Sequence, residues 1–410
     1  FPFGSQETFL EYEIEILSKR FNQVVIIPVI QKQSDSDVAR PIPSNCTVWR
    51  PTTDEHARVT YLSVAFFLLG KVWKEAFSWK WGPSFWKIKS LKHLVKSTSR
   101  LLATKSDWER WMRQLTELGA TPIISSYWLN SWLLFPLAWR ERNKASLLIV
   151  SRAHNYDLYH KRAFGHYHHF RPWLFKRLDG IYSDSQAGSD YMASLYDRHS
   201  AKFKTAYLGV PDPITLNPNN TATQGSFRII CTANLIPLKR VDMVVEALAL
   251  QQTNIRFDLF GDGPERGKIE AIAADLPANI DMHLHGRVGS PHIQQWYQEE
   301  PVDLFVLTST YEGLPVSIME AFSYGVPCLA TDVGGVSEAI NGKNGWVLPA
   351  DLTPEILADH LAKFIALGEA QHEAYRQAAR ATFDRQFSAE KNYRDYHDEL
   401  ISISPKHSPQ

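Results

Sequence analysis

Short apolar runs alternate along this chain with longer stretches in which apolar residues recur every three or four positions. The runs at 24–30, 147–150 and 304–307 are typical of strands that are buried on both faces of a sheet. The spacing of valine and leucine within 241–248 is typical of a helix with one apolar face. Because strand and helix alternate, the pattern predicts an α/β fold with parallel sheets that helices cover on both faces.

The beginning of the chain predicts a helix followed by a strand. Apolar residues have helical spacing over 9–17, and the early acids Glu7 and Glu11 suit a helix start. With the strand at 24–30, the order is that of a βαβ unit that lacks its first strand. We therefore expect the natural protein to carry that strand upstream of Phe1. Further strands are predicted at 122–126, 180–185, 205–210, 227–231, 256–260, 282–286 and 327–331.

A turn-rich stretch divides the chain into two parts. Residues 211–225 are rich in proline, asparagine and threonine and contain one charged residue, so they are predicted to be a linker. We expect an N-terminal domain over 1–210 and a C-terminal domain over 226–385. The segment from Ala370 to Leu400 is polar and predicted to be helical. We place the final helix and tail at 386–410.

Composition excludes several classes of protein. Lysine plus arginine equals aspartate plus glutamate at 44 each, so no global field draws the chain to nucleic acid or to a membrane. No apolar run approaches the roughly 20 residues that span a bilayer. The three cysteines, Cys46, Cys231 and Cys328, lie far apart, and we expect free thiols and a cytoplasmic protein.

One local segment departs from this neutral balance. Residues 61–106 hold nine lysines or arginines and one acid, Glu75, with four tryptophans interleaved. Tryptophan prefers the headgroup level of a bilayer and basic residues attract anionic lipid, so we favour a peripheral membrane patch on the cytosolic face. A nucleic-acid surface and ordinary helices with solvated lysines are the alternatives, and we expect no nucleic-acid partner.

Two glutamates, Glu312 and Glu320, stand eight residues apart in the most informative segment. Gly313 and Pro315 exclude a helix interior before 316, whereas 316–324 is predicted to be a helix. The backbone N–H groups at such a helix start favour phosphate, and a carboxylate on the helix can accept hydrogen bonds from ribose hydroxyls. The alternative for a bare glutamate pair is a solvated surface helix.

The residues around this pair carry a specific resemblance. The sequences Glu-Gly-Leu-Pro at 312–315, Ala-Phe-x-x-Gly-Val-Pro at 321–327 and Thr-Asp-Val-Gly-Gly-Val-Ser-Glu at 331–338 resemble the signature of retaining glycosyltransferases of family 4. The segment Pro-Phe-Gly-Ser-Gln-Glu-Thr-Phe at 2–9 resembles the form found in bacterial polysaccharide-assembly members. The resemblance implies the α/β GT-B fold, in which two Rossmann-like domains with parallel sheets face each other across a cleft and the C-terminal helix crosses back to the first domain.

The resemblance also implies roles for residues of the second half. Glu312 would face the transferred sugar and Glu320 would hold the ribose of the donor. The backbone close to the donor sugar and phosphate would come from Gly313, Leu314 and Pro315.

Two cations, Lys239 and Arg240, lie between the first strand and first helix of the second domain. They could neutralise a diphosphate and stabilise charge on the departing nucleotide; a solvated basic helix start is the alternative. Asn234 stands where the family usually has arginine, five residues before the lysine.

Residues elsewhere are similar to further family elements. His154, in Ser-Arg-Ala-His-Asn-Tyr-Asp-Leu-Tyr, follows a strand and resembles a cleft histidine, for which we favour a catalytic role beside Lys239 and Glu312. Asp157 is predicted to accept a hydrogen bond or orient a group there. Gly4 resembles the glycine of a loop near the donor sugar, and Gly263 resembles the Gly-x-Gly-Pro turn of the nucleotide domain.

Candidate metal ligands are present but are not arranged as sites. Asp35 and Asp37 form an Asp-x-Asp in a polar loop, and the histidines within 166–169 and 283–285 lack the spaced partners of a tetrahedral site. We expect no metal and no prosthetic group.

The resemblance, together with these observations, implies a retaining, metal-independent glycosyltransferase of the hexosyltransferase type in polysaccharide biosynthesis. Its donor would be a UDP- or GDP-linked sugar, and its acceptor a lipid-linked or growing glycan. Two other classes stay open: a non-catalytic nucleotide-sugar-binding scaffold with a GT-B body, to which Asn234 points, and a nucleotide-sugar epimerase that shares the fold. Donor turnover distinguishes the three.

Overall fold

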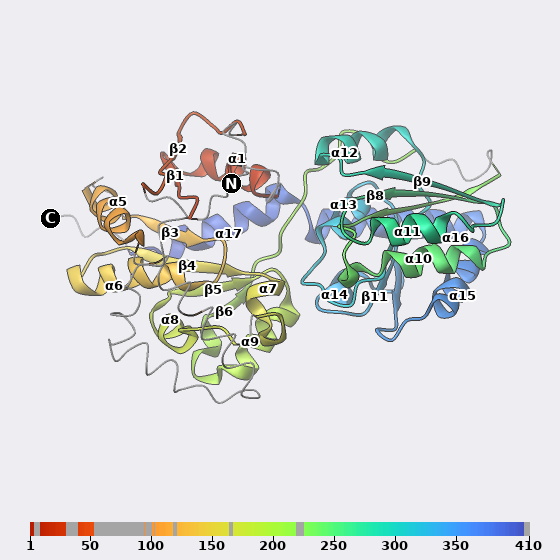
Figure 1. Ribbon diagram of the computed structural model, residues 1–410. Helices are drawn as coiled ribbons and strands as arrows, with labels where there is room; N and C mark the ends of the chain where they lie inside the picture. Colours follow the sequence, from red (N-terminus) through yellow and green to blue (C-terminus); the bar gives the residue numbers. More distant parts are fainter. Residues whose placement is uncertain are drawn as a thin grey trace. The chain divides into compact units, whose positions relative to one another are not determined.

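The computed structural model describes residues 1–3, 9–29, 40–52, 94, 101, 103–117, 121–163, 167–218 and 225–405. The chain forms two compact units (Figure 1). Unit 1 contains Phe1–Ala206 and Tyr393–Gln410, and unit 2 contains Tyr207–Asn392. Each unit is built around parallel strands, as the alternating pattern predicts.

Unit 1 holds a parallel sheet of four strands in the order β3-β4-β5-β6, and a separate parallel pair, β1 with β2. The strands are β1 (Val24–Ile26), β2 (Cys46–Val48), β3 (Ile123–Ser126), β4 (Leu148–Ala153), β5 (Gly180–Ser183) and β6 (Phe203–Thr205). The helices of its first segment are α1 (Phe9–Arg20), α5 (Lys105–Glu117), η1 (Ser131–Leu133), α6 (Leu134–Asn143), α7 (Asn155–Leu158), η2 (His160–Arg162), α8 (Arg171–Arg177), α9 (Gln186–Leu195) and η4 (Asp197–Lys202).

The core of unit 1 follows from the apolar run that predicts its central strand. Every residue of β4 is buried, and Ile149 packs with Leu137 of α6 and Phe175 of α8. In the register of the sheet, Ala153 of β4 lies opposite Ser183 of β5. The residues that follow these two strands therefore emerge side by side at one edge of the sheet.

The C-terminal helix α17 (Ala389–Ile403) packs on unit 1. Its Tyr396 hydroxyl lies 2.9 Å from the Ser125 hydroxyl, and Glu399 accepts a hydrogen bond of 3.0 Å from Tyr182. Leu400 joins the apolar cluster on β4. The prediction that the final helix returns to the first domain is confirmed, and the helical tail consists of α16 (Glu369–Gln386) and α17.

Unit 2 holds a parallel sheet of six strands in the order β12-β11-β10-β7-β8-β9. The strands are β7 (Phe227–Thr232), β8 (Ile255–Phe260), β9 (Ile280–Gly286), β10 (Leu304–Leu307), β11 (Cys328–Thr331) and β12 (Gly345–Leu348). The helices are η5 (Pro237–Lys239), α10 (Val241–Ala249), α11 (Arg266–Ala273), α12 (Ser290–Glu299), α13 (Val316–Ser323), α14 (Val336–Ala339), α15 (Pro354–Ile365) and α16.

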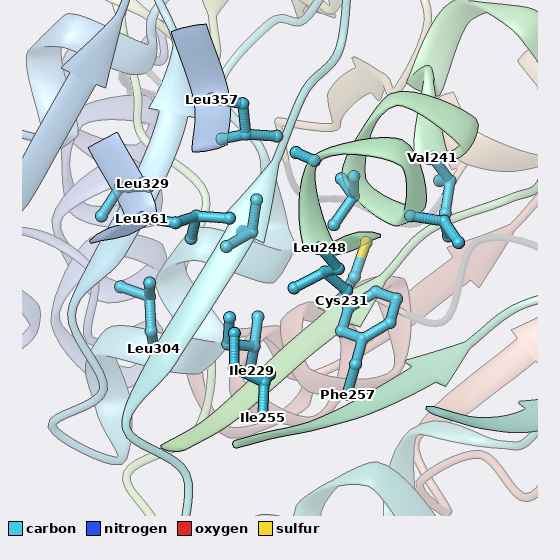
Figure 2. Packing of buried hydrophobic residues seen from close by; sticks show 14 of the residues in the cluster. Ile229, Cys231, Val241, Leu248, Ile255, Phe257, Leu304, Leu329, Leu357 and Leu361 are labelled. Atoms are coloured by element: carbon cyan, nitrogen blue, oxygen red, sulfur yellow. The ribbon is translucent and has the colours of Figure 1, made fainter. Parts of the chain in front are cut away.

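Apolar side chains from the sheet and from helices α10, α11 and α15 form the core of unit 2. Figure 2 shows Ile229 and Phe257 on the strands with Leu248 of α10 and Leu361 of α15 packed over them, and all four are almost fully buried. Burying one such side chain stabilises the fold by about 1.5–3 kcal/mol before entropy is counted. This cluster fixes the strands whose ends carry the loops described below.

The boundary between the units differs from the predicted linker at 211–225. Unit 2 already begins at Tyr207, and residues 211–218 belong to it. Asn217 is buried, and its side-chain amide donates to the carbonyls of Tyr297 and Glu300 at 2.7 and 2.8 Å. Residues 211–218 thus form part of unit 2, because the Asn217 amide side chain binds them to the end of α12.

The described residues contain no helix that is long and apolar enough to cross a membrane. The three cysteines are buried and carry free thiols.

Candidate active site

The loops that follow β7 and β10 are joined to each other in unit 2. Thr310 donates its backbone N–H to the Leu238 carbonyl of η5 at 2.8 Å. The Thr308 hydroxyl lies 3.0 Å from the Lys239 carbonyl and 2.9 Å from the Arg240 carbonyl. Because carboxyl ends of parallel strands share one edge of a sheet, these bonds bring the end of η5 next to the loop that holds Glu312.

Lys239 and Glu312 form an ion pair at this edge. The Lys239 Nζ lies 2.5 Å from Glu312 Oε1, and both side chains are largely buried. A pair at this depth is held more tightly than a surface pair because water screens it less. The two residues that the sequence assigns to the diphosphate and to the sugar are therefore direct neighbours.

The loop 312–315 ends at the N-terminus of α13. Within the described part of the chain, the backbone N–H groups of Leu314, Val316 and Ser317 donate to no protein acceptor. Pro315, the residue before the helix, has no N–H to donate. Three free donors at a helix start form a site of positive potential that suits an anion.

A close approach between two loops fixes the backbone of Glu312 and Gly313. Gly335 donates its N–H to the Gly313 carbonyl at 2.7 Å. Gly334 has a φ of +59°, and a Cβ there would lie 2.0 Å from the Glu312 carbonyl oxygen. Only glycine fits this position, so the second glycine-rich motif supports the first.

Glu320 lies on α13 and is half-buried. Among the described residues neither a cation nor a hydrogen-bond donor contacts its carboxyl group, and burial raises its pKa to about 7. A buried carboxyl group without a partner is an unfavourable arrangement for a fold alone. It is suited to a ligand that brings hydroxyl donors.

Arg240 and Asn234 are the two other positions at which the sequence analysis considers a phosphate-binding side chain. Arg240 has a φ of +46°, and its Nε donates to the Thr308 carbonyl at 2.6 Å. Partial burial lowers the pKa of its guanidinium. Asn234 is exposed. Arg240 therefore helps to fasten the loop after β10.

The glycines after β8 hold the neighbouring loop in place. A Cβ on Gly263 would lie 2.3 Å from the Leu235 carbonyl oxygen, and its N–H donates to the Asp262 carboxylate at 2.8 Å. A Cβ on Gly261 would lie 1.8 Å from the Ala233 carbonyl oxygen. The predicted Gly-x-Gly-Pro turn thus allows the loops after β7 and β8 to touch.

His154 is in unit 1, between β4 and α7. Its backbone N–H donates to the Asp157 carboxylate at 2.5 Å, and the Leu129 N–H donates to the same carboxylate at 2.5 Å. Burial raises the pKa of Asp157 to about 6, although the nearby His154 and these hydrogen bonds lower it in part. Asp157 therefore orients the loop that carries His154.

The imidazole of His154 is enclosed by aromatic rings and one carboxylate. It stacks on Tyr127 at 4.5 Å and meets the edge of Trp128 at 5.0 Å. Its Nδ1 lies 3.3 Å from Asp184 Oδ2, and both side chains are buried. Asp184 is not among the residues predicted from the sequence. It lies at the end of the predicted strand 180–185, which is the available signal, but the register of β4 and β5 is needed to set it beside His154.

Several predicted positions lie outside the described residues: Gly4, Asp35, Asp37 and most of the basic segment 61–106. In the described part of the chain no group of three or more histidine, cysteine or acidic side chains could hold a metal ion. His283 and His285 instead pair with Asp281 and Asp258 at 3.0 and 2.8 Å.

Parts of this chain are similar to known proteins. Residues 215–381 match the family model of glycosyl transferases group 1. The putative colanic acid biosynthesis glycosyltransferase WcaL of Salmonella typhimurium is 24% identical over 250 residues, which are 58% of this chain and 61% of that protein. Across five curated relatives, the chain spans between 24% and 61% of the relative's length.

Two solved structures share the fold. The apo form of the lipopolysaccharide outer core galactosyltransferase WaaB has a TM-score of 0.60 at 18% identity and covers 75% of this chain and 81% of its own. Anabaena Alr3699/HepE, solved in complex with UDP and glucose, has a TM-score of 0.56 at 16% identity and covers 72% of this chain and 81% of its own. The architecture is the GT-B fold, as predicted.

Proposed function

We propose that this chain, whose residues 215–381 form a glycosyl transferases group 1 domain, transfers a sugar from a nucleoside diphosphate donor to a glycan or lipid-linked acceptor in polysaccharide biosynthesis. The reaction retains the configuration of the sugar and needs no metal. The observation that carries the proposal is the Lys239–Glu312 pair beside the free N–H groups at the start of α13.

The diphosphate of the donor binds where positive charge is concentrated. Lys239 supplies a cation, and Leu314, Val316 and Ser317 supply N–H donors. As the bond between the anomeric carbon and the phosphate oxygen breaks, negative charge builds up on the leaving diphosphate. Fixed donors at that position stabilise the transition state more than the ground state.

Glu312 is placed to accept hydrogen bonds from hydroxyls of the transferred sugar. Its ion pair with Lys239 sets the carboxylate next to the phosphate-binding cation, which matches the adjacency of sugar and diphosphate in the donor. The acceptor hydroxyl forms the new bond on the same face of the sugar. Its proton passes to the leaving phosphate, so no side-chain nucleophile is required.

Glu320 binds the ribose of the donor. Its ionised form can accept hydrogen bonds from two neighbouring hydroxyls, and these bonds supply the partners that the carboxyl group lacks in the protein. For His154 of unit 1 we propose a contact with a sugar hydroxyl. The donor is a UDP- or GDP-linked hexose, and the complex of Anabaena HepE with UDP and glucose supports the uridine form.

The acceptor and its location are inferred from sequence and relatives. WcaL is named for colanic acid biosynthesis and WaaB for the lipopolysaccharide outer core, and both names support a bacterial surface glycan as product. The basic, tryptophan-rich segment 61–106 supports docking on an anionic membrane at its cytosolic face.

The test is turnover of a panel of UDP- and GDP-linked sugars, measured as release of the nucleoside diphosphate with and without glycan acceptors. We expect one donor to be consumed by the wild-type protein. Glu312→Gln should reduce kcat by about 100-fold or more, since it removes charge at the reacting sugar. Glu270→Gln, which changes an exposed glutamate of the same unit, is the matched control and should leave turnover unchanged.

The exposed Asn234 favours a second candidate, a scaffold that binds the nucleotide sugar without transferring it. It stands where the family usually has an arginine that would add positive charge at the diphosphate. Donor binding in a titration, with no turnover for any member of the panel, would support the scaffold and overturn transfer. Isomerisation of the donor sugar without release of diphosphate would support an epimerase instead.

A further inference from the structure

The buried carboxylate beside His154 has no place in the reaction as described so far. Asp184 follows β5, and His154 follows β4, the neighbouring strand. Ala153 and Ser183 lie opposite each other in the register, and the Asp184 N–H donates to the Ala153 carbonyl at 3.3 Å. The sheet itself therefore holds the imidazole and the carboxylate side by side, with Nδ1 and Oδ2 3.3 Å apart.

The other ring nitrogen of His154 is free. Nε2 is buried and contacts no hydrogen-bond partner among the described residues, and the His154 side chain is 8% exposed. A buried polar atom without a partner is unfavourable unless a ligand supplies one. Ring contacts with Tyr127 and Trp128 limit rotation of the imidazole.

We propose that Asp184 is a positioning residue that keeps His154 in the Nδ1–H tautomer, so that Nε2 accepts a hydrogen bond from a hydroxyl group of the sugar substrate. A carboxylate accepts only, so Nδ1 must donate to it, and in the neutral ring the lone pair then belongs to Nε2. This inference rests on the proposed function for the identity of the hydroxyl, but the tautomer does not depend on it.

The surroundings of the imidazole favour Asp184 as the orienting group. Asp157 binds the backbone N–H of His154 rather than its ring. Glu13 of α1 interacts electrostatically with His154 but forms its ion pair with Arg152 at 3.2 Å. Tyr127 contributes its ring face. Among the described groups that face His154, the Asp184 carboxylate is the one that contacts a ring nitrogen.

The alternative is that Asp184 only supports the turn before α9. The helix N-cap is already supplied by Ser185, whose hydroxyl accepts the Gly188 N–H at 3.2 Å. Loss of a purely structural carboxylate would change stability and leave the protonation pattern of His154 unaltered. The two interpretations therefore differ in a measurable property of the ring.

The first experiment is NMR of the full chain with ¹⁵N-labelled histidine, in which His154→Gln identifies the resonances of His154. We expect the Nδ1–H tautomer in the wild type and a shift toward the Nε2–H form in Asp184→Ala. Asp190→Asn, an exposed aspartate on α9, should leave the spectrum of His154 unchanged. A wild-type Nε2–H tautomer, or an unchanged tautomer in Asp184→Ala, would overturn the proposal even if the chain has no transferase activity.

The second experiment uses the donor that the panel identifies. Asp184→Asn should reduce kcat/KM by about 10- to 100-fold and move the acid limb of its pH profile to lower pH, because a neutral amide stabilises the imidazolium less. In a His154→Gln background the same substitution should change kcat/KM by less than about twofold, since the two residues act as a unit. Independent effects of the two substitutions, with an unmoved pH profile, would contradict the assignment.

Discussion

The two units of this chain use buried polar groups in different ways. In unit 2 the candidate site is built on a continuous apolar core and on backbone positions where glycine is required, such as Gly261 and Gly334. Unit 1 instead contains a buried network of ionisable side chains that lies outside any loop motif. Glu13 of α1, Arg152 of β4 and His397 of α17 meet there, although they are far apart in sequence.

This difference determines which functional residues can be recognised from the sequence. The site of unit 2 depends on loops whose residues are contiguous, so its motifs carry the information. The network of unit 1 depends on contacts between segments that only the fold brings together. Burial would raise the pKa of Glu13, but Arg152 and then His397 hold it below its ordinary value. The Arg152 guanidinium also lies over the Tyr396 ring at 4.2 Å.

The largest effect is expected from breaking this network. Arg152→Met leaves Glu13 buried without its main partner, which should destabilise unit 1 by about 3–5 kcal/mol. Because the pKa of Glu13 is lowered in the fold, its contribution is present above the ordinary value and is lost as pH falls through the folded value. Hydrogen exchange of peptides from α17 should accelerate by about 100-fold or more at neutral pH.

A double variant tests whether the lost charge or the changed side-chain shape causes the destabilisation by Arg152→Met. Glu13→Gln combined with Arg152→Met removes both charges and should recover much of the lost protection in α17. If Arg152→Met alone leaves exchange of α17 unchanged, the network does not fasten that helix, and the contrast between the units is wrong.

A backbone change in unit 2 should have the next largest effect. Gly334→Ala places a Cβ against the Glu312 carbonyl at a positive φ, which we expect to cost about 2–3 kcal/mol and to displace the loop 312–315. Gly342→Ala is the matched control, since its φ is +78° but nothing lies near its Cβ. The control should cost only about 1 kcal/mol, from the conformation alone.

Calorimetric unfolding of both variants, together with nucleotide titration, measures this difference. Equal destabilisation by the two substitutions would mean that the approach of Gly334 to Glu312 does not shape the site.

The smallest effect concerns Glu320, whose carboxyl group has no partner among the described residues of unit 2. Its pKa is raised to about 7, so the proton it holds contributes stability below the ordinary carboxyl value, and that contribution is lost as pH rises through about 7. Glu320→Gln should remove this dependence, which we expect to amount to about 1 kcal/mol after screening by solvent.

Nucleotide binding also gives a measure of the ionisation of Glu320. If ribose hydroxyls bind the ionised carboxylate, UDP binding near pH 7 should release a fraction of a proton, and titrations in buffers of different ionisation enthalpy measure it. Proton release that is identical in wild type and Glu320→Gln would assign the titration to another group.

The sequence predicts much of unit 2 because its strands β7, β10 and β11 are apolar runs between turn residues. It does not predict β12, in which only three apolar residues follow Gly345 after a turn-like stretch. It does not predict β2 either, because a strand of three residues is too short to show a pattern. In the site, the Lys239–Glu312 contact depends on the hydrogen bonds between the loops after β7 and β10. The Asp184–His154 contact requires the register of two strands, which no local pattern specifies.

Nucleotide binding by unit 2 is the central claim, and titration calorimetry of the full chain with UDP and GDP tests it most directly. We predict that one nucleotide binds the wild type, and that Lys239→Met weakens its affinity by about tenfold or more because a cation at the diphosphate is lost. Lys268→Met, an exposed lysine of the same unit, should bind as the wild type does. Binding of neither nucleotide, or equal affinities for wild type and Lys239→Met, would contradict the account.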